Sequence, residues 1–264
     1  MIFLPEDRKI CEMHLKAARE RGWSGKPAGE LVVAAGSAFL GAPYAAGTLE
    51  RKGPEELVIN LRAFDCVTFV ENAVVLAGLI RAGRTAFQDY AAALQRIRYR
   101  GGRCCGYPSR LHYFTDWLRD NGRKGIVRDI TRELGGIPFR KAFHALTDRR
   151  EEIPPLGDAA AFCRVRSVEA ACSRRTLYRI PKARLKGFSG IENGDIIAVA
   201  TDAEGIDVSH TGIAVRGPRG LHLLHASGAA GKVVLSSETL YRYLISRRSR
   251  TGILAGRVGA EITF

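Results

Sequence analysis

The sequence predicts an α+β fold in which a series of helices precedes an antiparallel sheet. Apolar residues recur with helical spacing through much of the first half of the chain, whereas short β-prone runs separated by turn residues dominate after Asn193. The chain has 264 residues, 46% of them hydrophobic and 26% charged, which is enough for one large domain with an ordinary core. We therefore expect a single α+β domain spanning residues 1–264.

Helical periodicity predicts four helices before residue 100, at residues 6–21, 28–39, 67–80 and 86–99. The first of them belongs to an N-terminal helical extension, residues 1–30. A fifth helix is expected to begin after Ser109, whose hydroxyl is a good N-cap, and to run to about Asn121.

Four β-prone runs predict an antiparallel meander, at residues 196–200, 211–216, 220–226 and 232–235. A helix at 237–244 and a last strand at 252–258 are expected to follow. Residues 100–190 have a mixed character and are expected to form an inserted or elaborated region. Within it, residues 140–186 match no pattern that predicts a structure.

The net charge of +14 and the isoelectric point near 9.9 attract the chain to polyanions. The basic residues are spread out, and their densest clusters, at residues 96–100, 164–184 and 247–250, resemble no nucleic-acid module. We therefore expect no specific nucleic-acid partner. A basic protein that holds nucleic acid or an anionic wall polymer, with inert cysteines, remains the alternative to an enzyme.

The six cysteines lack both the density of a disulfide scaffold and the paired spacing of a zinc site. No metal and no other cofactor are expected, although Cys66, two histidines and a carboxylate would be the rival zinc ligands. Residues 67–80 are too short to span a membrane, and the first residues show no signal-peptide pattern. Both a cytoplasmic protein and an exported one whose leader has been removed fit these features.

Cys66 directly precedes the apolar run of the predicted helix 67–80, with Asp65 in front of it. The free N–H groups at a helix start stabilise a thiolate over a thiol, so this position favours a cysteine that acts as a nucleophile. A buried core cysteine is the plain alternative. Asp65 either caps the helix or holds a substrate amine.

A candidate base lies far downstream, where His210 begins a predicted strand and His225 lies on the next one. If the hairpin closes about Gly217-Pro218, paired positions sum to about 435 and the two histidines face each other. Cysteine, base and orienting group together follow the logic of a catalytic triad. We expect His210 to take the proton of Cys66 and form an ion pair with it, while His225 fixes the tautomer of His210.

Two sets of motifs resemble cell-wall cysteine hydrolases. The Phe-Asp-Cys motif at 64–66, the run 39–44 and the strand around Ser209-His210-Thr211 are similar to NlpC-type cysteine peptidases of the papain-like superfamily. More narrowly, segments 64–71, 109–117 and 252–254 resemble the bacterial N-acetylmuramoyl-L-alanine amidase-like family, known mainly as a domain of unknown function. The resemblance extends over about residues 30–258 and implies a papain-like NlpC-type core, with the nucleophile helix packed on an antiparallel β-sheet.

This resemblance implies a monomeric, cofactor-free hydrolase of peptidoglycan or its muropeptides, acting in the periplasm or outside the cell. The amide between the muramyl lactyl group and L-alanine is the bond that the amidase-like family implies. The related NlpC-type enzymes imply the γ-D-glutamyl bond instead, and acyl transfer on the same fold is a further alternative.

The resemblance and the helical pattern also suggest residues that contact the substrate. Tyr44 resembles the tyrosine that lines the nucleophile's pocket, and Asp65 and Ser209 flank the catalytic residues, where they could hold a substrate amine or amide. Tyr113 and Asp116 could wall the substrate groove, although the spacing from Tyr113 also fits simple packing within a helix.

Overall fold

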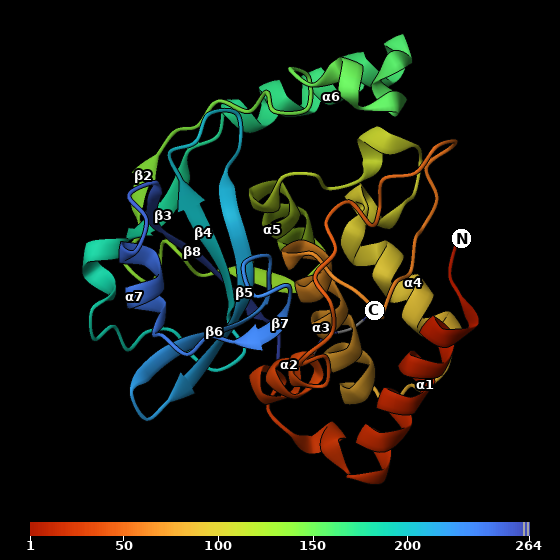
Figure 1. Ribbon diagram of the computed structural model, residues 1–264, viewed down its shortest axis with the longest axis vertical. Coiled ribbons are helices and arrows are strands. Elements are labelled where there is room, and N and C mark those ends of the chain that lie inside the picture. The colour runs from red at the N-terminus through yellow and green to blue at the C-terminus, as the bar shows by residue number, and fades with distance from the viewer. Residues whose placement is uncertain (261, 263) are drawn as a thin grey trace.

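The computed structural model describes residues 1–260, 262 and 264, and it has the predicted α+β class (Figure 1). Five helices come first in the chain: α1 Pro5–Glu20, α2 Ala28–Ser37, α3 Cys66–Arg81, α4 Phe87–Arg98 and α5 Phe114–Arg123. They gather on one side of the molecule, and the sheet lies on the other (Figure 1). The predicted segregation of helices and sheet is therefore confirmed.

The sheet is antiparallel and larger than the predicted meander. Its main strands are β4 Ile196–Thr201, β5 Val208–Gly217, β6 Gly220–Ser227, β7 Lys232–Leu235 and β8 Arg250–Val258. Strands β4 to β7 form the meander, but β8 returns to pair with the free edge of β4. Three short strands extend the sheet beyond β8: β1 Val127–Asp129, β2 Ile137–Phe139 and β3 Leu177–Pro181. Helix α7, Leu240–Ile245, connects β7 to β8.

The sheet separates two hydrophobic layers. The larger one lies between the sheet and the helices, and α3 crosses its centre with every residue from Thr68 to Ile80 buried. The smaller one covers the opposite face, where α7 packs through Leu240 and Leu244. Burial of α3 on all sides explains why its sequence is a nearly continuous apolar run rather than an amphipathic stripe.

One predicted helix start is wrong. Ser109 does not cap α5, because it lies in a 3₁₀ turn, Tyr107–Ser109, five residues before the helix begins at Phe114. Its hydroxyl donates to Gly106 O at 2.6 Å and accepts from the N–H of Cys105 at 2.9 Å. A serine whose hydroxyl forms its hydrogen bonds within a local turn cannot be distinguished in the sequence from a serine that caps a helix.

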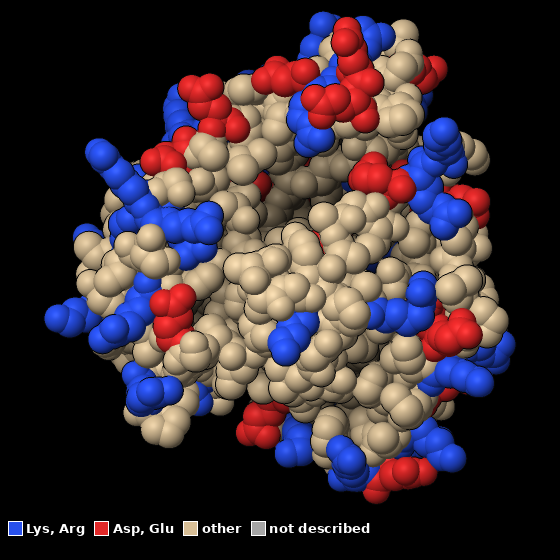
Figure 2. Space-filling model, in the orientation of Figure 1, with Lys and Arg blue, Asp and Glu red and all other residues tan. Residues whose placement is uncertain are grey.

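Residues 140–186, which matched no sequence pattern, include α6, Ala159–Ser173, which runs along the top of the molecule in the view of Figure 1. Figure 2 shows a hollow between this upper part and the body of the protein. Among the described residues, no helix is long and apolar enough to cross a membrane.

Candidate active site

Cys66 is the first residue of α3, and the side chain of Asp65 caps that helix. Asp65 Oδ1 accepts the N–H groups of Val67 at 3.0 Å and Thr68 at 2.8 Å, and the hydroxyl of Thr68 at 2.9 Å. Within the described structure, the N–H of Cys66 donates no hydrogen bond to another residue. The helix start thus leaves one backbone donor beside the sulfur.

The histidines lie on adjacent strands, as expected, but with a different register. Ile213 pairs with Leu224, so the paired positions sum to 437 rather than 435. A shift of two residues keeps every side chain on its face, whereas a shift of one would have separated the histidines. His210 Nε2 and His225 Nδ1 therefore lie 2.6 Å apart, at hydrogen-bond distance.

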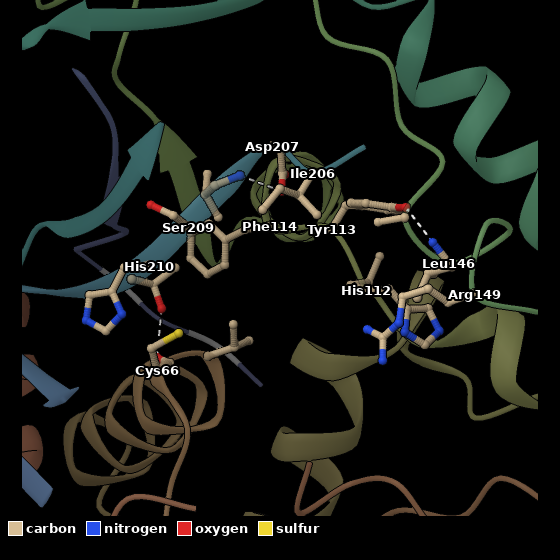
Figure 3. A pocket seen from close by; sticks show the side chains of 15 residues that line it. Cys66, His112, Tyr113, Phe114, Leu146, Arg149, Ile206, Asp207, Ser209 and His210 are labelled. Atoms are coloured by element: carbon tan, nitrogen blue, oxygen red, sulfur yellow. Dashed lines mark hydrogen bonds between the residues drawn. The ribbon is translucent and has the colours of Figure 1, made fainter. Parts of the chain in front are cut away.

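Cys66 and His210 line one pocket of about 250 Å³ (Figure 3). Its other polar lining residues are His112, Tyr113, Arg149, Asp207, Ser209 and Thr211. Apolar side chains complete the wall, from Val67, Leu111, Phe114, Ala145, Leu146, Ile206 and Val208. The pocket thus joins the start of α3, the start of β5, the segment before α5 and the region that matched no sequence pattern.

Burial dominates the electrostatics of the pocket. It raises the pKa of the Cys66 thiol, and the Asp65 carboxylate raises it further, against the lowering effect of hydrogen bonds from Thr211. Burial, His225 and Arg250 lower the pKa of His210 to about 3. Burial and Arg250 likewise lower the pKa of His225 to about 4. These shifts favour a thiol at Cys66 and neutral imidazoles at His210 and His225.

These shifts disfavour the expected thiolate–imidazolium ion pair in the free site. No hydrogen bond joins the Cys66 sulfur to His210 in the described structure, where the hydrogen bond of the His210 ring is to His225. Catalytic hydrogen bonds are often loose in free enzymes and tighten in the substrate complex. The sequence could not show the burial that shifts both pKa values against the ion pair.

The predicted substrate-binding residues have different locations. Burial raises the pKa of the Tyr44 hydroxyl, and its nearness to Cys66 and Asp65 raises it further. Ser209 and Tyr113 line the pocket. Asp116 does not, because it is buried in ion pairs with Arg100 at 2.7 Å and Arg175 at 2.6 Å.

Three residues that the sequence did not single out surround the catalytic candidates. Thr211 donates its hydroxyl to the backbone oxygen of Cys66 at 2.7 Å and so ties β5 to the start of α3. The ring of Tyr243, from α7, lies 6.0 Å from that of His210 and 5.8 Å from that of His225. The Arg250 guanidinium lies over the ring of Tyr243, 3.7 Å from the ring centroid. Thr211 lies within the motif around His210, whereas no local motif marks Tyr243 or Arg250.

Among residues 1–260, 262 and 264, no group of three or more histidine, cysteine, aspartate or glutamate side chains has a geometry that could hold a metal ion.

Comparison with known proteins assigns the chain to a family. A family model described as N-acetylmuramoyl-L-alanine amidase-like matches residues 34–253, which include Cys66, His210 and His225. The chain belongs to this amidase-like family. No curated protein sequence matches it.

Solved structures share the fold of this amidase-like chain. An N-acetylmuramoyl-L-alanine amidase from Bacteroides uniformis ATCC 8492 is 34% identical with a TM-score of 0.82, covering 88% of this chain and 99% of that one. A Bacteroides fragilis protein provisionally named a xylanase is 38% identical with a TM-score of 0.81, covering 85% and 100%. A Legionella pneumophila protein at 21% identity, with a TM-score of 0.70 and coverage of 95% and 94%, supports the fold alone.

Proposed function

We propose that this member of the amidase-like family is a cysteine amidase that cleaves the bond between the muramyl lactyl group and L-alanine in peptidoglycan or its muropeptides. The observation that carries the proposal is the hydrogen-bonded pair of His210 and His225 at a pocket that also holds Cys66 at a helix start. In this proposal the fold is of the NlpC-type, papain-like kind, and the chain acts as a monomer in the periplasm or outside the cell.

In the proposed reaction, the Cys66 sulfur attacks the amide carbon while His210 takes the thiol proton. Because His210 Nε2 faces His225, the proton goes to Nδ1, and the resulting imidazolium donates from Nε2 to His225 Nδ1. The carbonyl oxygen becomes negative as sulfur adds, and the N–H of Cys66 is placed to donate to it. Transfer of the proton to the alanine nitrogen then releases the peptide and leaves a thioester.

Water completes the reaction, with His210 as general base for its attack on the thioester. The products are a free lactyl carboxylate and a peptide that begins with L-alanine. Tyr44 and Ser209 border the nucleophile and the base, and we propose that they contact the reacting amide. Asp65 caps the helix through Oδ1, which accepts three hydrogen bonds, and we propose that its other carboxylate oxygen faces the substrate amine.

Glycoside hydrolysis, which the name of the Bacteroides fragilis protein suggests, has less support here. Glycosidases generally use a pair of carboxyl groups that flank the bond. Of the residues that line the pocket in the described structure, Asp207 alone carries a carboxylate. Its two oxygens already accept the N–H groups of Val208 at 2.9 Å and Thr115 at 2.6 Å.

Product masses after digestion of purified peptidoglycan and muropeptides test the proposal. The amidase reaction yields peptides that begin with L-alanine and muramyl products that have lost the whole peptide, and the Cys66→Ser variant yields neither. Cleavage after D-glutamate would show that the enzyme is an endopeptidase instead. Stem peptides with all amides intact would favour an acyltransferase. Steeply salt-dependent polymer binding without cleavage, unchanged in Cys66→Ser, would indicate a basic binding protein instead.

A further inference from the structure

One wall of the pocket takes no part in the reaction described above. It consists of His112 and Tyr113, before α5, and of Leu146 and Arg149, from the region that matched no sequence pattern. Figure 3 shows His112 and Arg149 together, on the side of the pocket away from Cys66 and His210. A substrate bound at the sulfur would extend toward this wall.

A buried carboxylate fixes the position of the wall. Glu169 of α6 accepts the Tyr113 hydroxyl at 2.5 Å, the Leu146 N–H at 3.0 Å and the Thr147 hydroxyl at 2.5 Å. The N–H of Thr147 approaches the same carboxylate at 3.4 Å. Hydrogen bonds to a charged acceptor are the strong ones, and this cluster joins α6, the start of α5 and the segment that bears Arg149. The wall is thus built and held in place before any substrate arrives.

Arg149 carries a positive charge at this wall. Its Nε donates to Glu152 at 2.8 Å, but both side chains are more than 60% exposed, so this ion pair is weak and a substrate carboxylate can replace Glu152. Within the described structure no hydrogen bond uses its two terminal nitrogens. The neighbouring Asp148 is paired with His144, and the oxygens of Asp207 are bound to backbone N–H groups. A guanidinium with free terminal nitrogens fits a carboxylate in two-point contact.

His112 adds an acceptor beside this cation. Its Nε2 contacts the backbone oxygen of Tyr107 at 2.9 Å, which requires the ring to carry its proton on that nitrogen. Burial and the charge of Arg110 lower the pKa of His112 to about 3, so the ring is neutral and its Nδ1 is an acceptor. A peptide offers both matching groups, a carboxylate for Arg149 and an N–H for His112.

We propose that Arg149 determines substrate specificity by binding a free carboxylate of the stem peptide, so that acidic stem peptides are preferred over amidated ones. This inference rests on the proposed amidase function. The residue after L-alanine in a stem peptide is D-glutamate, whose α-carboxylate is either free or amidated as D-isoglutamine. The two forms differ by one charged group, which the guanidinium distinguishes.

The test compares kcat/KM for N-acetylmuramoyl-L-alanyl-D-glutamate and for the same compound with D-isoglutamine. A hydrogen bond to a charged group contributes about 1.5–3 kcal/mol, so the wild type is expected to prefer the acid by about 10- to 100-fold. Arg149→Gln is expected to lose this preference by slowing the acid substrate alone. Arg149→Lys should keep part of it, since the charge remains but the two-point geometry does not.

Arg150→Gln is the matched control. It removes the same charge from the adjacent residue, whose Nε donates to Leu156 O at 3.1 Å and whose guanidinium lies over Phe162 rather than in the pocket. This variant should keep the full preference for the acid. Equal cleavage of both substrates by the wild type, or an unchanged preference in Arg149→Gln, would overturn the inference while leaving the amidase function intact. Failure of the wild type to cleave either compound at the lactyl–alanine bond would overturn both.

Discussion

His225 acts on the reaction only through His210, and its role can be separated from that of a packing residue. Its Nδ1 must accept the N–H of His210 Nε2 for the other nitrogen of His210 to take a proton. Replacement by phenylalanine keeps the ring but removes the acceptor, and we expect kcat to fall on the order of 10²-fold with little change in KM. Asparagine supplies an acceptor oxygen and should recover most of this loss. Equal loss in both variants would contradict the orienting role.

The reactivity of Cys66 should follow the raised pKa of its thiol rather than an ion pair. The rate of alkylation by iodoacetamide in the free enzyme is expected to be low at pH 6 and to keep rising through pH 9, because only the thiolate reacts. His210→Ala should change this profile little. A rate that is constant from pH 5 to 8 in the wild type and drops in His210→Ala would restore the ion pair that the sequence suggested.

The sequence located the catalytic candidates because each depends on a local signal. A cysteine at the start of an apolar helix and a histidine on each of two consecutive strands can be recognised in the sequence. The predicted pairing of the strands was wrong by two residues, but a shift of two leaves each side chain on the same face of the sheet. The protonation state was not predictable, since it depends on burial by distant segments. Tyr243, Arg250 and Arg149 were missed for the same reason: only the fold brings them to the site.

At the scale of the elements, Asp65 couples the stability of α3 to the chemistry of its first residue. Asp65→Ala removes the helix cap and is expected to cost about 1 kcal/mol in the free energy of unfolding, measured with urea. Asp65→Asn keeps a capping oxygen but removes the charge that raises the pKa of Cys66. This variant should keep its stability and shift the alkylation profile to lower pH. An unshifted profile would show that the carboxylate does not act on the thiol.

Most elements outside the middle region were predictable, whereas α6 and the strands β1 to β3 were not. Helices α1 to α4 lie within two residues of the ranges that periodicity predicts, because their buried faces impose that periodicity. Strands β1 to β3 have three to five residues each, too few for alternation to be visible, and they obtain their pairing from β8 and from one another. The start of α5 was misplaced because a turn serine and a capping serine look alike in sequence.

At the scale of the whole molecule, three histidines with lowered pKa values predict acid sensitivity. The pKa is about 3 for His112 and His210 and about 4 for His225, against about 6.5 in an unfolded chain. Between about pH 3 and pH 6.5 the unfolded chain binds more protons than the folded protein. The free energy of unfolding is therefore highest above pH 6.5 and falls progressively as the pH is lowered toward 3.

Urea unfolding at a series of pH values measures this loss. His112→Asn should reduce the dependence of the unfolding free energy on pH between 6.5 and 4. A free energy of unfolding that stays constant from pH 7 to 4 would contradict the burial of these neutral rings.

The central claim, that Cys66 forms a thioester with the muramyl lactyl group, is tested most directly by intact-protein mass spectrometry. The enzyme is mixed with N-acetylmuramoyl-L-alanyl-D-glutamate, quenched in acid within milliseconds to seconds, and digested to locate any adduct. We predict an adduct with the mass of the N-acetylmuramoyl acyl group on the peptide that contains Cys66, which is absent in Cys66→Ser and accumulates before free lactyl carboxylate appears. Release of L-alanyl-D-glutamate at the full rate by Cys66→Ser, or cleavage with no adduct at any time, would contradict the account.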